Sequence, residues 1–409
     1  MNKTTISTIA IIAVLLIGQG AIIAYDSSLE GNEDTGTAYS LLARVNTEGS
    51  GVYINSDVLY ERGGTSAFYT VESDGSYSVN TANAAAWEGL VMGTPGPTSI
   101  QHIQMQSLVQ SMGLTFSIYA ANSNTSAGCG CVYYDSSVTS ASIAEANTQI
   151  QGGIVWEPQY SKIVNDDNGF TGLALTNDLF PNHTCCVLAG ASDYVNSNAD
   201  TVEQFLAGYV KSVEWVQAAL AAGQVDPQNA DYQKLVSICV ERVAGIDEAT
   251  IKDALNNITY TYGDADGTLT SLKNDIAELT ENLSMLGSLK NSLSSLGFSS
   301  EGEIAAAQFA DTFVDDSYLN YVVNHEIPTS AVTTATVYVA VIAGDIHQIA
   351  LHVGVALGFF EDYGINVHLV SCTNGAGVAV ALQNGEAQLG LLGAPPATIT
   401  TINSKLITQ

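Results

Sequence analysis

Apolar and polar residues alternate along most of the chain in stretches typical of strands and amphipathic helices. Short apolar runs at residues 39–46, 114–120 and 152–158 predict strands. Longer stretches with apolar residues at every third or fourth position, at residues 198–223 and 269–293, predict helices. Because strands alternate with helices through much of the chain, we expect an α/β fold with a largely parallel sheet.

Two segments depart from this alternation. Residues 55–80 carry a Tyr/Phe/Val alternation around an Asp-Gly pair, which predicts an antiparallel hairpin. Residues 227–324 are mostly helical in pattern and contain an apolar stripe, which we expect to pack in a core and not to bind a partner. The stripe consists of Leu269, Leu272, Ile276, Leu279, Leu283 and Leu286.

The end of the chain has the pattern of the beginning of an α/β fold. Residues 335–371 predict a strand, a Gly-Asp turn, an amphipathic helix and a second strand. Residues 377–409 continue with a helix, a strand, a turn and a helix, and a short linker at residues 325–337 precedes the whole segment. A fold that opens so near the end of a chain needs an explanation.

The other end of the chain is almost wholly apolar. Residues 5–24 are long enough to cross a bilayer as a helix, Lys3 precedes them, and the exit resembles a cleavage site poorly. We therefore expect residues 1–25 to be a transmembrane anchor, with a cleaved signal as the alternative, and residues 26–38 to be a tether. Either outcome places the rest outside the cytoplasm.

The overall charge excludes several classes of function. The 409 residues include 41 Asp and Glu against 11 Lys and Arg, a net charge of −30. Such a surface repels nucleic acid and anionic lipid headgroups. With 46% apolar and 13% charged residues, the chain has the composition of a folded protein.

The six cysteines are Cys129, Cys131, Cys185, Cys186, Cys239 and Cys372. Their even number permits full pairing in an oxidising compartment. Neither "CGC" nor "CC" has the C-x-x-C spacing of a zinc site, so we expect disulfides or buried thiols in preference to a metal site.

Two sets of motifs together match the pattern of one family. The first set is "GFFEDYGINV", "NGAGVAVALQNGEAQLG" and "GAPP", all between residues 358 and 396. The second set is "LARVNTEGSGVYI", "GLVMGTPGPTSIQHIQMQSLVQSMGL" and "GGIVWEPQYSKIV", between residues 42 and 164. Together they resemble the solute-binding proteins of ABC importers, in particular the group that serves nitrate, taurine, alkyl sulfonates and thiamine-type pyrimidines. The first set resembles that group's first segment, and the second set resembles its later segments.

Every part of the family pattern is present, but its first segment stands last. The resemblance therefore implies a two-lobed, periplasmic-binding-protein-like (type II) fold that is circularly permuted; chain ends of compact domains often lie close together. The rival interpretation is a truncated tandem copy that another chain completes. The expected domains are 39–88 for part of lobe 1 and a hairpin, 89–190 for lobe 2, 191–326 for a helical return region on lobe 1, and 327–409 for the permuted segment of lobe 1.

In a fold of this kind the ligand lies outside the carboxyl ends of the strands. Turns that leave a strand and open a helix then line the cleft, and their free N–H groups can hold an anion without a cationic side chain. Asp345, Asn374 and Ser99 are expected N-caps, and Pro395 or Pro396 suits the first turn of a helix. The expected ligand-binding residues are Gly344, Asp345, Ile346, His347, Gln348, Thr373, Asn374, Gly375, Gly393, Ala394, Pro395, Asn46, Thr47, Thr94, Pro97, Thr98, Ser99, Trp156 and Glu157.

The side chains among these do not single out an anion. Trp156 can stack on a flat ligand or pack between the lobes, and Glu157 and Asp345 favour an amino or amidine group. Arg44 is expected either beneath the site or exposed. This chemistry suits a zwitterion or a neutral heterocycle at least as well as nitrate or a sulfonate.

The leading hypothesis is an extracytoplasmic, membrane-tethered receptor that delivers a small polar organic solute to ABC permease subunits, without catalysis and without a cofactor. Its cleft would close about a hinge when the ligand bridges the lobes. One alternative is a metal-dependent enzyme on the same fold that uses His102, His183 or His347 with cysteines, as in the related pyrimidine synthase of the thiamine pathway; "HTCC" at residues 183–186 is a shorter cluster than that enzyme's. Another is a surface sensor or scaffold whose cleft is filled by the hairpin.

Overall fold

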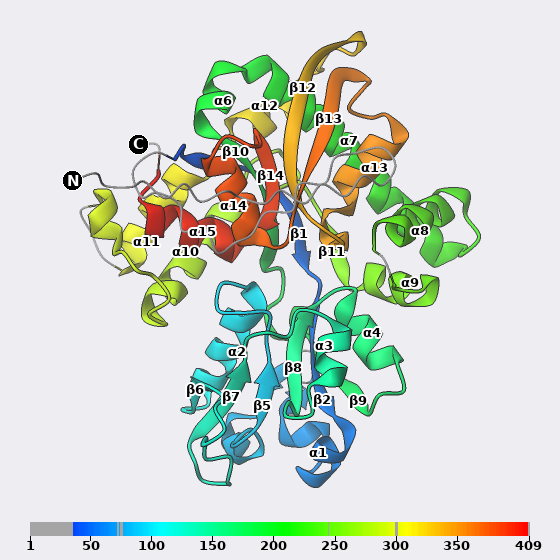
Figure 1. The fold of residues 1–409 in the computed structure, drawn as a ribbon. Coiled ribbons are helices and arrows are strands. Elements are labelled where there is room, and N and C mark those ends of the chain that lie inside the picture. The colour runs from blue at the N-terminus through cyan, green and yellow to red at the C-terminus, as the bar shows by residue number, and fades with distance from the viewer. Residues whose placement is uncertain (1–35, 72, 74–76, 244, 299–301, 408–409) are drawn as a thin grey trace, which may run out of the picture.

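A computed structural model describes residues 36–407 of the chain, apart from residues 72, 74–76, 244 and 299–301. The protein has two α/β lobes, each built on a six-stranded sheet. In Figure 1 lobe 1 lies above lobe 2, and β1 leads from one lobe into the other. The expected α/β fold is confirmed, but the expectation of a largely parallel sheet is wrong, because each sheet combines parallel with antiparallel strand pairs.

Lobe 1 contains both the beginning and the end of the described chain. Its sheet has the order β11-β1-β10-β14-β12-β13. Its strands are β1 (Tyr39–Glu48), β10 (Thr184–Ala191), β11 (Ile258–Tyr260), β12 (Ser330–Ile342), β13 (Tyr363–Cys372) and β14 (Leu389–Gly393). β12 runs parallel to β13 and β14, whereas β10 runs antiparallel to both β14 and β1.

Helices cover this sheet and form much of the lobe. They are α6 (Ser192–Ser197), α7 (Ala199–Val225), α8 (Ala230–Arg242), α9 (Glu248–Asn256), α10 (Thr270–Met285), α11 (Gly302–Phe313), α12 (Ser317–Asn324), α13 (Ile349–Leu357), α14 (Gly375–Gln383) and α15 (Ala394–Ser404). In α10 the predicted stripe faces inwards, since Leu272, Ile276, Leu279 and Leu283 are buried. These residues belong to the same core as the strands, so the stripe is a packing face, as expected.

The last segment of the chain completes this sheet. β14 pairs with β10 from Cys186 opposite Gly393 to Gly190 opposite Leu389. The two ends of the described chain also meet, because Tyr39 donates a hydrogen bond from its hydroxyl to the carbonyl oxygen of Ala397, at 2.8 Å. The residues from Ser330 onwards therefore belong to the same lobe as β1.

Lobe 2 is an uninterrupted insertion between β1 and β10. Its sheet has the order β6-β7-β5-β8-β2-β9. Its strands are β2 (Ser50–Asn55), β5 (Val91–Gly93), β6 (Thr115–Ile118), β7 (Cys131–Asp135), β8 (Gly152–Trp156) and β9 (Phe170–Leu175). Its helices are α1 (Ser56–Glu61), α2 (Ile100–Ser111), α3 (Ala141–Ala146), α4 (Gln159–Asn165) and α5 (Thr176–Leu179).

The predicted hairpin forms within lobe 2. β3 (Tyr69–Val71) pairs antiparallel with β4 (Tyr77–Val79), after the short helix α1. Phe68 and Tyr69 pack edge-on against Trp87 in one core of the lobe. α1 lies at the end of lobe 2 remote from lobe 1 (Figure 1), so this part of the chain packs away from the junction between the lobes.

The lobe boundaries differ from the predicted ones. Residues 39–88 were expected in lobe 1, but β2 already pairs with β8 and β9 of the second sheet. Lobe 2 was expected to reach residue 190, but β10 begins at Thr184 and pairs with β1. The physical reason is that the crossover takes a single residue, Gly49, between the end of β1 and the start of β2.

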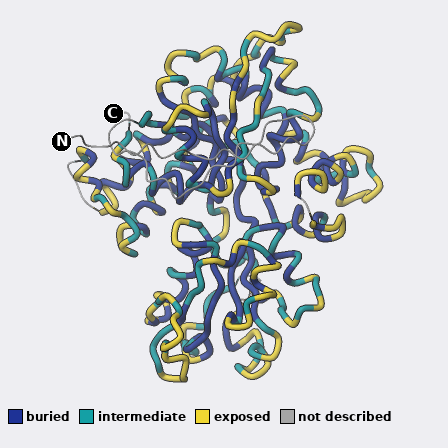
Figure 2. The backbone as a smooth tube through the Cα atoms, viewed as in Figure 1, coloured by how far each residue is buried: buried dark blue, intermediate teal, exposed yellow. Residues whose placement is uncertain are grey.

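Each lobe has its own buried interior. Figure 2 shows buried backbone through the middle of both lobes and exposed backbone at their outer loops. The largest core spans both faces of the lobe 1 sheet, and two smaller cores lie on the two faces of the lobe 2 sheet. Within residues 36–407, no helix combines the length and the apolar character that a membrane span requires. The expected anchor and its alternative, a cleaved signal, lie outside the described residues.

Candidate functional site

Two crossover segments connect the lobes and lie side by side. The first is Glu48–Ser50 and the second is Asn182–Thr184. The backbone N–H of Glu48 donates to the carbonyl oxygen of His183 at 3.1 Å, and the N–H of Asn182 donates to Glu48 Oε1 at 3.1 Å. Glu48 and Asn182 both have left-handed backbone, with φ of 67° and 61°. Such positions sharply change the direction of a chain, which suits a hinge.

A cavity of about 340 Å³ opens beside the second crossover, between the two lobes. Lobe 2 contributes one face of α2, the end of α5 and the residues after it. Lobe 1 contributes one face of α10 and the start of α15. The lining residues are Ile100, Ile103, Gln104, Ser107, Leu179, Phe180, Pro181, His183, Thr184, Asp275, Ile276, Glu278, Leu279, Asn282 and Ala394. A volume of this size is in the range of small-ligand sites.

The helical period explains why these residues meet at the cavity. Ile100, Ile103, Gln104 and Ser107 follow one another at steps of three, one and three along α2, so they share one face. Ser99 fixes the start of this helix, because its hydroxyl accepts the N–H of His102 at 3.1 Å. Ser99 is thus the N-cap that the sequence predicted.

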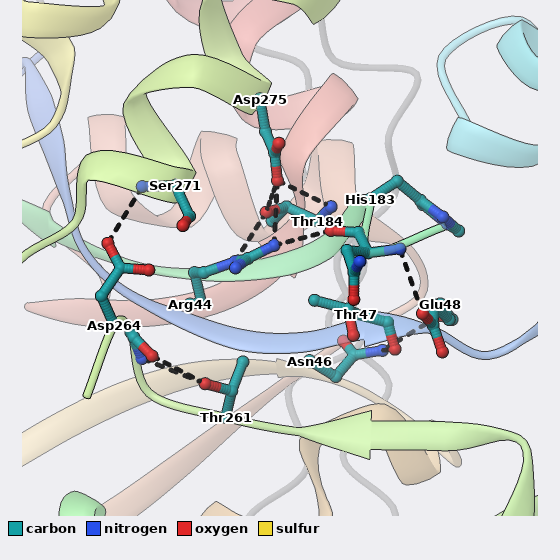
Figure 3. A network of polar contacts seen from close by, with 12 residues as sticks. Arg44, Asn46, Thr47, Glu48, His183, Thr184, Thr261, Asp264, Ser271 and Asp275 are labelled. Carbon is teal, nitrogen blue, oxygen red and sulfur yellow. Dashed lines mark hydrogen bonds and ion pairs between the residues drawn. The ribbon is translucent and has the colours of Figure 1, made fainter. Parts of the chain in front are cut away.

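Arg44 lies beneath this cavity and is 8% exposed. Its Nε donates to Thr184 Oγ1 at 2.9 Å, and its Nη2 donates to the carbonyl oxygen of Asn182 and to Asp275 Oδ2, both at 2.9 Å. Asp275 also accepts the backbone N–H and the hydroxyl of Thr184, at 3.1 and 2.5 Å. Figure 3 shows this network, which ties β1, the second crossover and α10 together. Of the two expected places for Arg44, the buried one is correct.

Two carboxyl groups of α10 lie at the lobe 1 wall of the cavity. Burial raises the pKa of Asp275, while the hydrogen bond from Thr184 and the charge of Arg44 lower it in part. The carboxylate forms an ion pair with Arg44 and its side chain is 30% exposed. Glu278 lies one helical turn further along α10 and is exposed on the wall of the same cavity. Carboxyl groups therefore occupy the lobe 1 wall.

Two residues that line the cavity each have a buried acceptor atom without a partner. Gln104 is 5% exposed, and its Oε1 atom is buried without a hydrogen bond. His183 places its Nδ1 atom 2.6 Å from the carbonyl oxygen of Phe180, so Nδ1 carries the proton. Burial lowers the pKa of His183 to about 4, so the ring is neutral and Nε2 is a free, buried acceptor.

A second hollow of about 240 Å³ lies nearby between the lobes. Among its lining residues are Pro97, Thr98 and His102 of lobe 2 and Ile399 of lobe 1. His102 is 4% exposed and its Nδ1 is 2.9 Å from the hydroxyl oxygen of Thr94. Burial lowers the pKa of His102 to about 4, so this ring is neutral as well.

The predicted residues at the turn after β12 lie at the hinge. Asp345 accepts the backbone N–H of His347 at 2.9 Å, as an N-cap, and its Oδ1 is 2.7 Å from the His347 ring atom Nδ1. The other ring nitrogen, Nε2, is 2.9 Å from the carbonyl oxygen of Gly49. Gln348 joins two strands, since its Oε1 accepts the N–H of Ile342 and its Nε2 donates to Leu391 O, both at 3.0 Å.

The other predicted residues of this turn and of the end of β1 also lie near the hinge and not at a cavity wall. The hydroxyl of Tyr260 donates to the carbonyl oxygen of Ile346 at 2.9 Å, whereas Gly344 is exposed. Asn46 and Thr47 are buried within β1, and the side-chain nitrogen of Asn46 donates to the carbonyl oxygens of Thr47 and Glu48. These predicted residues hold the first crossover in place.

Glu157 connects the lobes and lines neither of the two interlobe hollows. It is fully buried, and its carboxylate accepts the N–H and the hydroxyl of Ser161 and the side-chain N–H of Asn257, the last at 2.6 Å. Burial raises the pKa of Glu157, and the hydrogen bond from Asn257 partly offsets this. Asn257 follows α9 of lobe 1, so this bond crosses between the lobes. Trp156, next to it, is half-buried and packs against one core of lobe 2.

The remaining predicted turns begin helices as expected. Asn374 caps α14 by accepting the N–H of Gly377 at 2.9 Å, and both Thr373 and Asn374 are exposed, with Gly375 buried beneath. α15 begins at Ala394 after Gly393, with Pro395 in its first turn. Ala394 lines the larger cavity, while Pro97 and Thr98 line the smaller one. The structure thus brings three of the predicted residues to these two hollows.

All six cysteines are free thiols. Cys129 and Cys131 are half-buried, and the other four are buried. The Sγ atoms of Cys185 and Cys186 are 3.9 Å apart at the start of β10. Among the residues that the structure describes, no three His, Cys, Asp or Glu side chains gather as metal ligands would.

Sequence reasoning missed most of the larger cavity's wall. The missed residues are polar residues at ordinary positions within two helices, where such residues usually face solvent. They are Gln104 and Ser107 of α2 and Asp275, Glu278 and Asn282 of α10. His183 was considered only together with the cysteines that follow it. The one local signal was the presence of polar residues, among them Gln101 and Gln104, on the face of α2 that packs inwards. Polar residues are seldom buried, so their presence on that face indicates a functional surface.

Comparison with known proteins relates the sequence to one family. A sequence model of the NMT1-like family matches residues 13–227, just over half of the chain. No curated protein matches the sequence. Among solved structures, the periplasmic nitrate-binding protein NrtA from Synechocystis PCC 6803 is similar, with 13% identity, coverage of 70% of this chain and 67% of that chain, and a TM-score of 0.47.

Proposed function

The chain belongs to the NMT1-like family, and from that premise we propose that it is an extracytoplasmic solute-binding protein of an ABC importer. Its solute is a small polar organic molecule held between the lobes. The observation that carries the proposal is the 340 Å³ cavity, whose walls come from both lobes and carry polar side chains from each. A ligand that fills it contacts α2 of one lobe and α10 of the other at the same time.

Hinge closure is the mechanism. Within the described residues, the chain passes between the lobes only at the two crossover segments, and both bend at left-handed residues. A ligand that bridges α2 and α10 stabilises the closed arrangement more than an open one, because its contacts with one of the lobes are lost on opening. The closed form is then the form that the permease subunits recognise.

Circular permutation accounts for the order of the segments. Three kinds of contact support it: β14 pairs with β10, β12 pairs with β13 and β14, and the hydroxyl of Tyr39 bonds to Ala397. Residues near the end of the chain thus lie beside residues near its beginning, where an unpermuted relative would run straight through. The link between α12 and β12 would be the joint between the ancestral ends.

The location proposed for the protein follows from its first residues. The apolar residues 5–24 would insert in the membrane and leave the lobes outside the cytoplasm. A tether to the membrane would keep the lobes near the permease and raise their effective concentration there.

Thermal unfolding in the presence of candidate solutes tests the binding function. A solute that binds the folded state raises the melting temperature in a concentration-dependent way. The panel contains sulfonates, nitrate, pyrimidines and amino compounds. The variant Ser107→Trp fills the cavity and should lose the shift, whereas Gln110→Trp, exposed on the same helix and outside the cavity, should keep it. Stabilisation by no solute, or an equal shift in the Ser107→Trp variant, would overturn the proposal.

A further inference from the structure

The two crossover segments contain strained backbone. Within the residues that the structure describes, three residues other than glycine have left-handed backbone: Glu48, Asn182 and Lys405. Lys405 caps the end of α15, a position where left-handed residues are common. Glu48 ends β1, and Asn182 lies between α5 and β10, so neither caps a helix. This conformation therefore needs another explanation at the joint between the lobes.

Left-handed backbone is unfavourable for both residues. In residues other than glycine it brings Cβ close to the following carbonyl oxygen. Asparagine tolerates this conformation better than most residues, whereas a glutamate in it is uncommon. Glycine would adopt it without strain, as Gly49 does beside Glu48 with a φ of +89°. Strained residues persist only where their surroundings hold them, and they concentrate at segments that switch between conformations.

The contacts that hold the two strained residues join one crossover to the other. The N–H of Glu48 donates to the carbonyl oxygen of His183, and the N–H of Asn182 donates to Glu48 Oε1, both at 3.1 Å. The carbonyl oxygen of Asn182 accepts Nη2 of Arg44 at 2.9 Å. Glu48 is buried, so its carboxylate lies within the joint. Each crossover thus helps to hold the other, and we expect the two residues to change conformation together.

Contacts between the lobes act in the opposite direction. Asn257 of lobe 1 donates to the carboxylate of Glu157 of lobe 2 at 2.6 Å. Asn165 of lobe 2 donates to Asp253 of lobe 1 at 2.7 Å. Separation of the lobes would break these bonds and would allow the crossovers to change direction. The two sets of interactions therefore favour different arrangements, as a two-state element requires.

We propose that Glu48 and Asn182 form a strained hinge, whose left-handed backbone opposes the arrangement in which the lobes touch and relaxes when they separate. This inference rests on the solute-binding function proposed above and concerns the regulation of the same site. The empty receptor favours separated lobes, and a bound solute supplies the contacts that outweigh the strain. The strain thereby limits closure without solute, so the permease subunits meet mostly loaded receptor.

Paired alanine and glycine variants isolate the backbone strain. Glu48→Ala and Glu48→Gly both remove the carboxylate, and Asn182→Ala and Asn182→Gly both remove the amide, so each pair differs only at Cβ. Left-handed backbone favours glycine over alanine by about fivefold to thirtyfold. We therefore expect the ratio of separated to touching lobes to be at least about fivefold higher in each alanine variant than in its glycine partner. Lys405→Ala and Lys405→Gly are the matched control, because Lys405 also has left-handed backbone and is exposed outside the joint.

Fluorine NMR without any solute measures this ratio. 5-Fluorotryptophan labels the three tryptophans of the chain, Trp87, Trp156 and Trp215. Trp156 lies opposite Ser50 of the first crossover in the sheet of lobe 2, so its signal should report the arrangement of the lobes. Trp87 and Trp215 pack in the cores of lobe 2 and lobe 1 and serve as internal references. The radius of gyration from small-angle scattering identifies which signal belongs to separated lobes.

Three results would overturn the inference. Equal ratios within the alanine and glycine pairs would show that the backbone stays left-handed in both arrangements. A higher ratio with glycine would show that flexibility, and not strain, governs opening. An equal effect at Lys405 would show that the effect does not arise at the joint. Unfolding temperatures check that each variant is folded.

A second background ensures that separated lobes can be observed. Asn257→Ala removes a bond between the lobes and should enrich the separated arrangement. Absence of a second Trp156 signal in all variants, even in this background, would overturn the strained hinge together with the proposed hinge closure. Solute binding itself would remain a separate matter, which the thermal unfolding experiment decides.

Discussion

The ring atom Nε2 of His347 donates a hydrogen bond to the carbonyl oxygen of Gly49, at 2.9 Å. The same oxygen accepts the backbone N–H of Glu157 at 2.9 Å. Three segments far apart in the sequence therefore meet at one atom of the first crossover: the turn after β12, the crossover itself and the end of β8. Both ring nitrogens of His347 face acceptors, since Nδ1 is 2.7 Å from Asp345 Oδ1, so the ring is an imidazolium.

Replacement of Gly49 by alanine should be markedly destabilising. Gly49 has a φ of +89°, and an added Cβ would overlap the His347 ring. Left-handed backbone costs a non-glycine residue roughly 1–2 kcal/mol, and loss of the buried hydrogen bond adds roughly 1–3 kcal/mol. Chemical denaturation measures the change in the free energy of unfolding. The matched control is Gly113→Ala, where φ is +75° and an added Cβ meets nothing within 4 Å; similar losses in the two variants would contradict the proposed contact.

Stability should fall in alkaline solution because of His347. Burial by itself lowers the pKa of this histidine, but the Asp345 carboxylate and the other neighbours outweigh it and raise the pKa to about 9. The folded state therefore holds the proton more tightly than the unfolded state. The resulting stabilisation is complete below the unfolded pKa of about 6.5 and is lost as the pH rises through about 9.

The variant His347→Gln isolates this effect from other titrations. One pKa unit corresponds to about 1.4 kcal/mol, so the unaltered protein should lose on the order of 2–3 kcal/mol more than the variant between pH 6 and pH 10. Urea denaturation at a series of pH values gives both curves. Parallel curves across this range would show that His347 is not charged in the folded protein.

Much of the fold could be predicted from the sequence because its elements have clear local periods. The strands at residues 39–46 and 152–158, the helix α7 and the strand–helix order after Ser330 all follow from the spacing of apolar residues. The crossover at Gly49 could not be found in this way. The polar residues 46–51 indicate a turn, but only Gly49 separates β1 from β2, and a local pattern does not indicate which sheet a strand joins.

The candidate site was harder to predict for a different reason. The caps Asp345, Asn374 and Ser99 were correctly predicted, because capping depends on residues within one turn. Which of these turns meets a cavity depends on how two lobes pack, and that packing leaves Asp345 bonded within the hinge. Conversely, Gln104 and Asp275 look like ordinary helical positions until α2 and α10 are brought together.

Loss of the side chain of Asn257 should weaken the connection between the lobes. Its Nδ2 donates to the buried carboxylate of Glu157 at 2.6 Å, and Asn165 of lobe 2 donates to Asp253 of lobe 1 at 2.7 Å close by. We expect Asn257→Ala to lower the free energy of unfolding by about 1–3 kcal/mol, because a buried carboxylate loses a donor. It should also enlarge the radius of gyration measured by small-angle scattering, as the lobes separate more readily. Asn256→Ala, an exposed neighbour, should change neither quantity; a loss of stability without expansion would mean that the bond stabilises only one lobe.

Arg44 should contribute more to stability than any exposed ion pair of similar geometry. It is 8% exposed and donates to Thr184, Asn182 and Asp275, whereas Lys211 and Asp362 form a pair whose side chains are 44% and 48% exposed. Removal of one partner of a buried pair leaves the other charge uncompensated, although solvent at Asp275 reduces the penalty. We expect Arg44→Met to cost about 2–3 kcal/mol and Lys211→Met less than about 1 kcal/mol in chemical denaturation.

A double variant separates the charge from the packing at this position. When both partners are replaced by apolar residues no buried charge is left unpaired, so Arg44→Met combined with Asp275→Leu should be more stable than Arg44→Met alone. The comparison gives the coupling between the two side chains, since they are in contact and their effects are not additive. Equal costs for Arg44→Met and Lys211→Met would show that the second crossover does not depend on this ion pair. Full additivity in the double variant would show that the two side chains act independently, although they lie 2.9 Å apart.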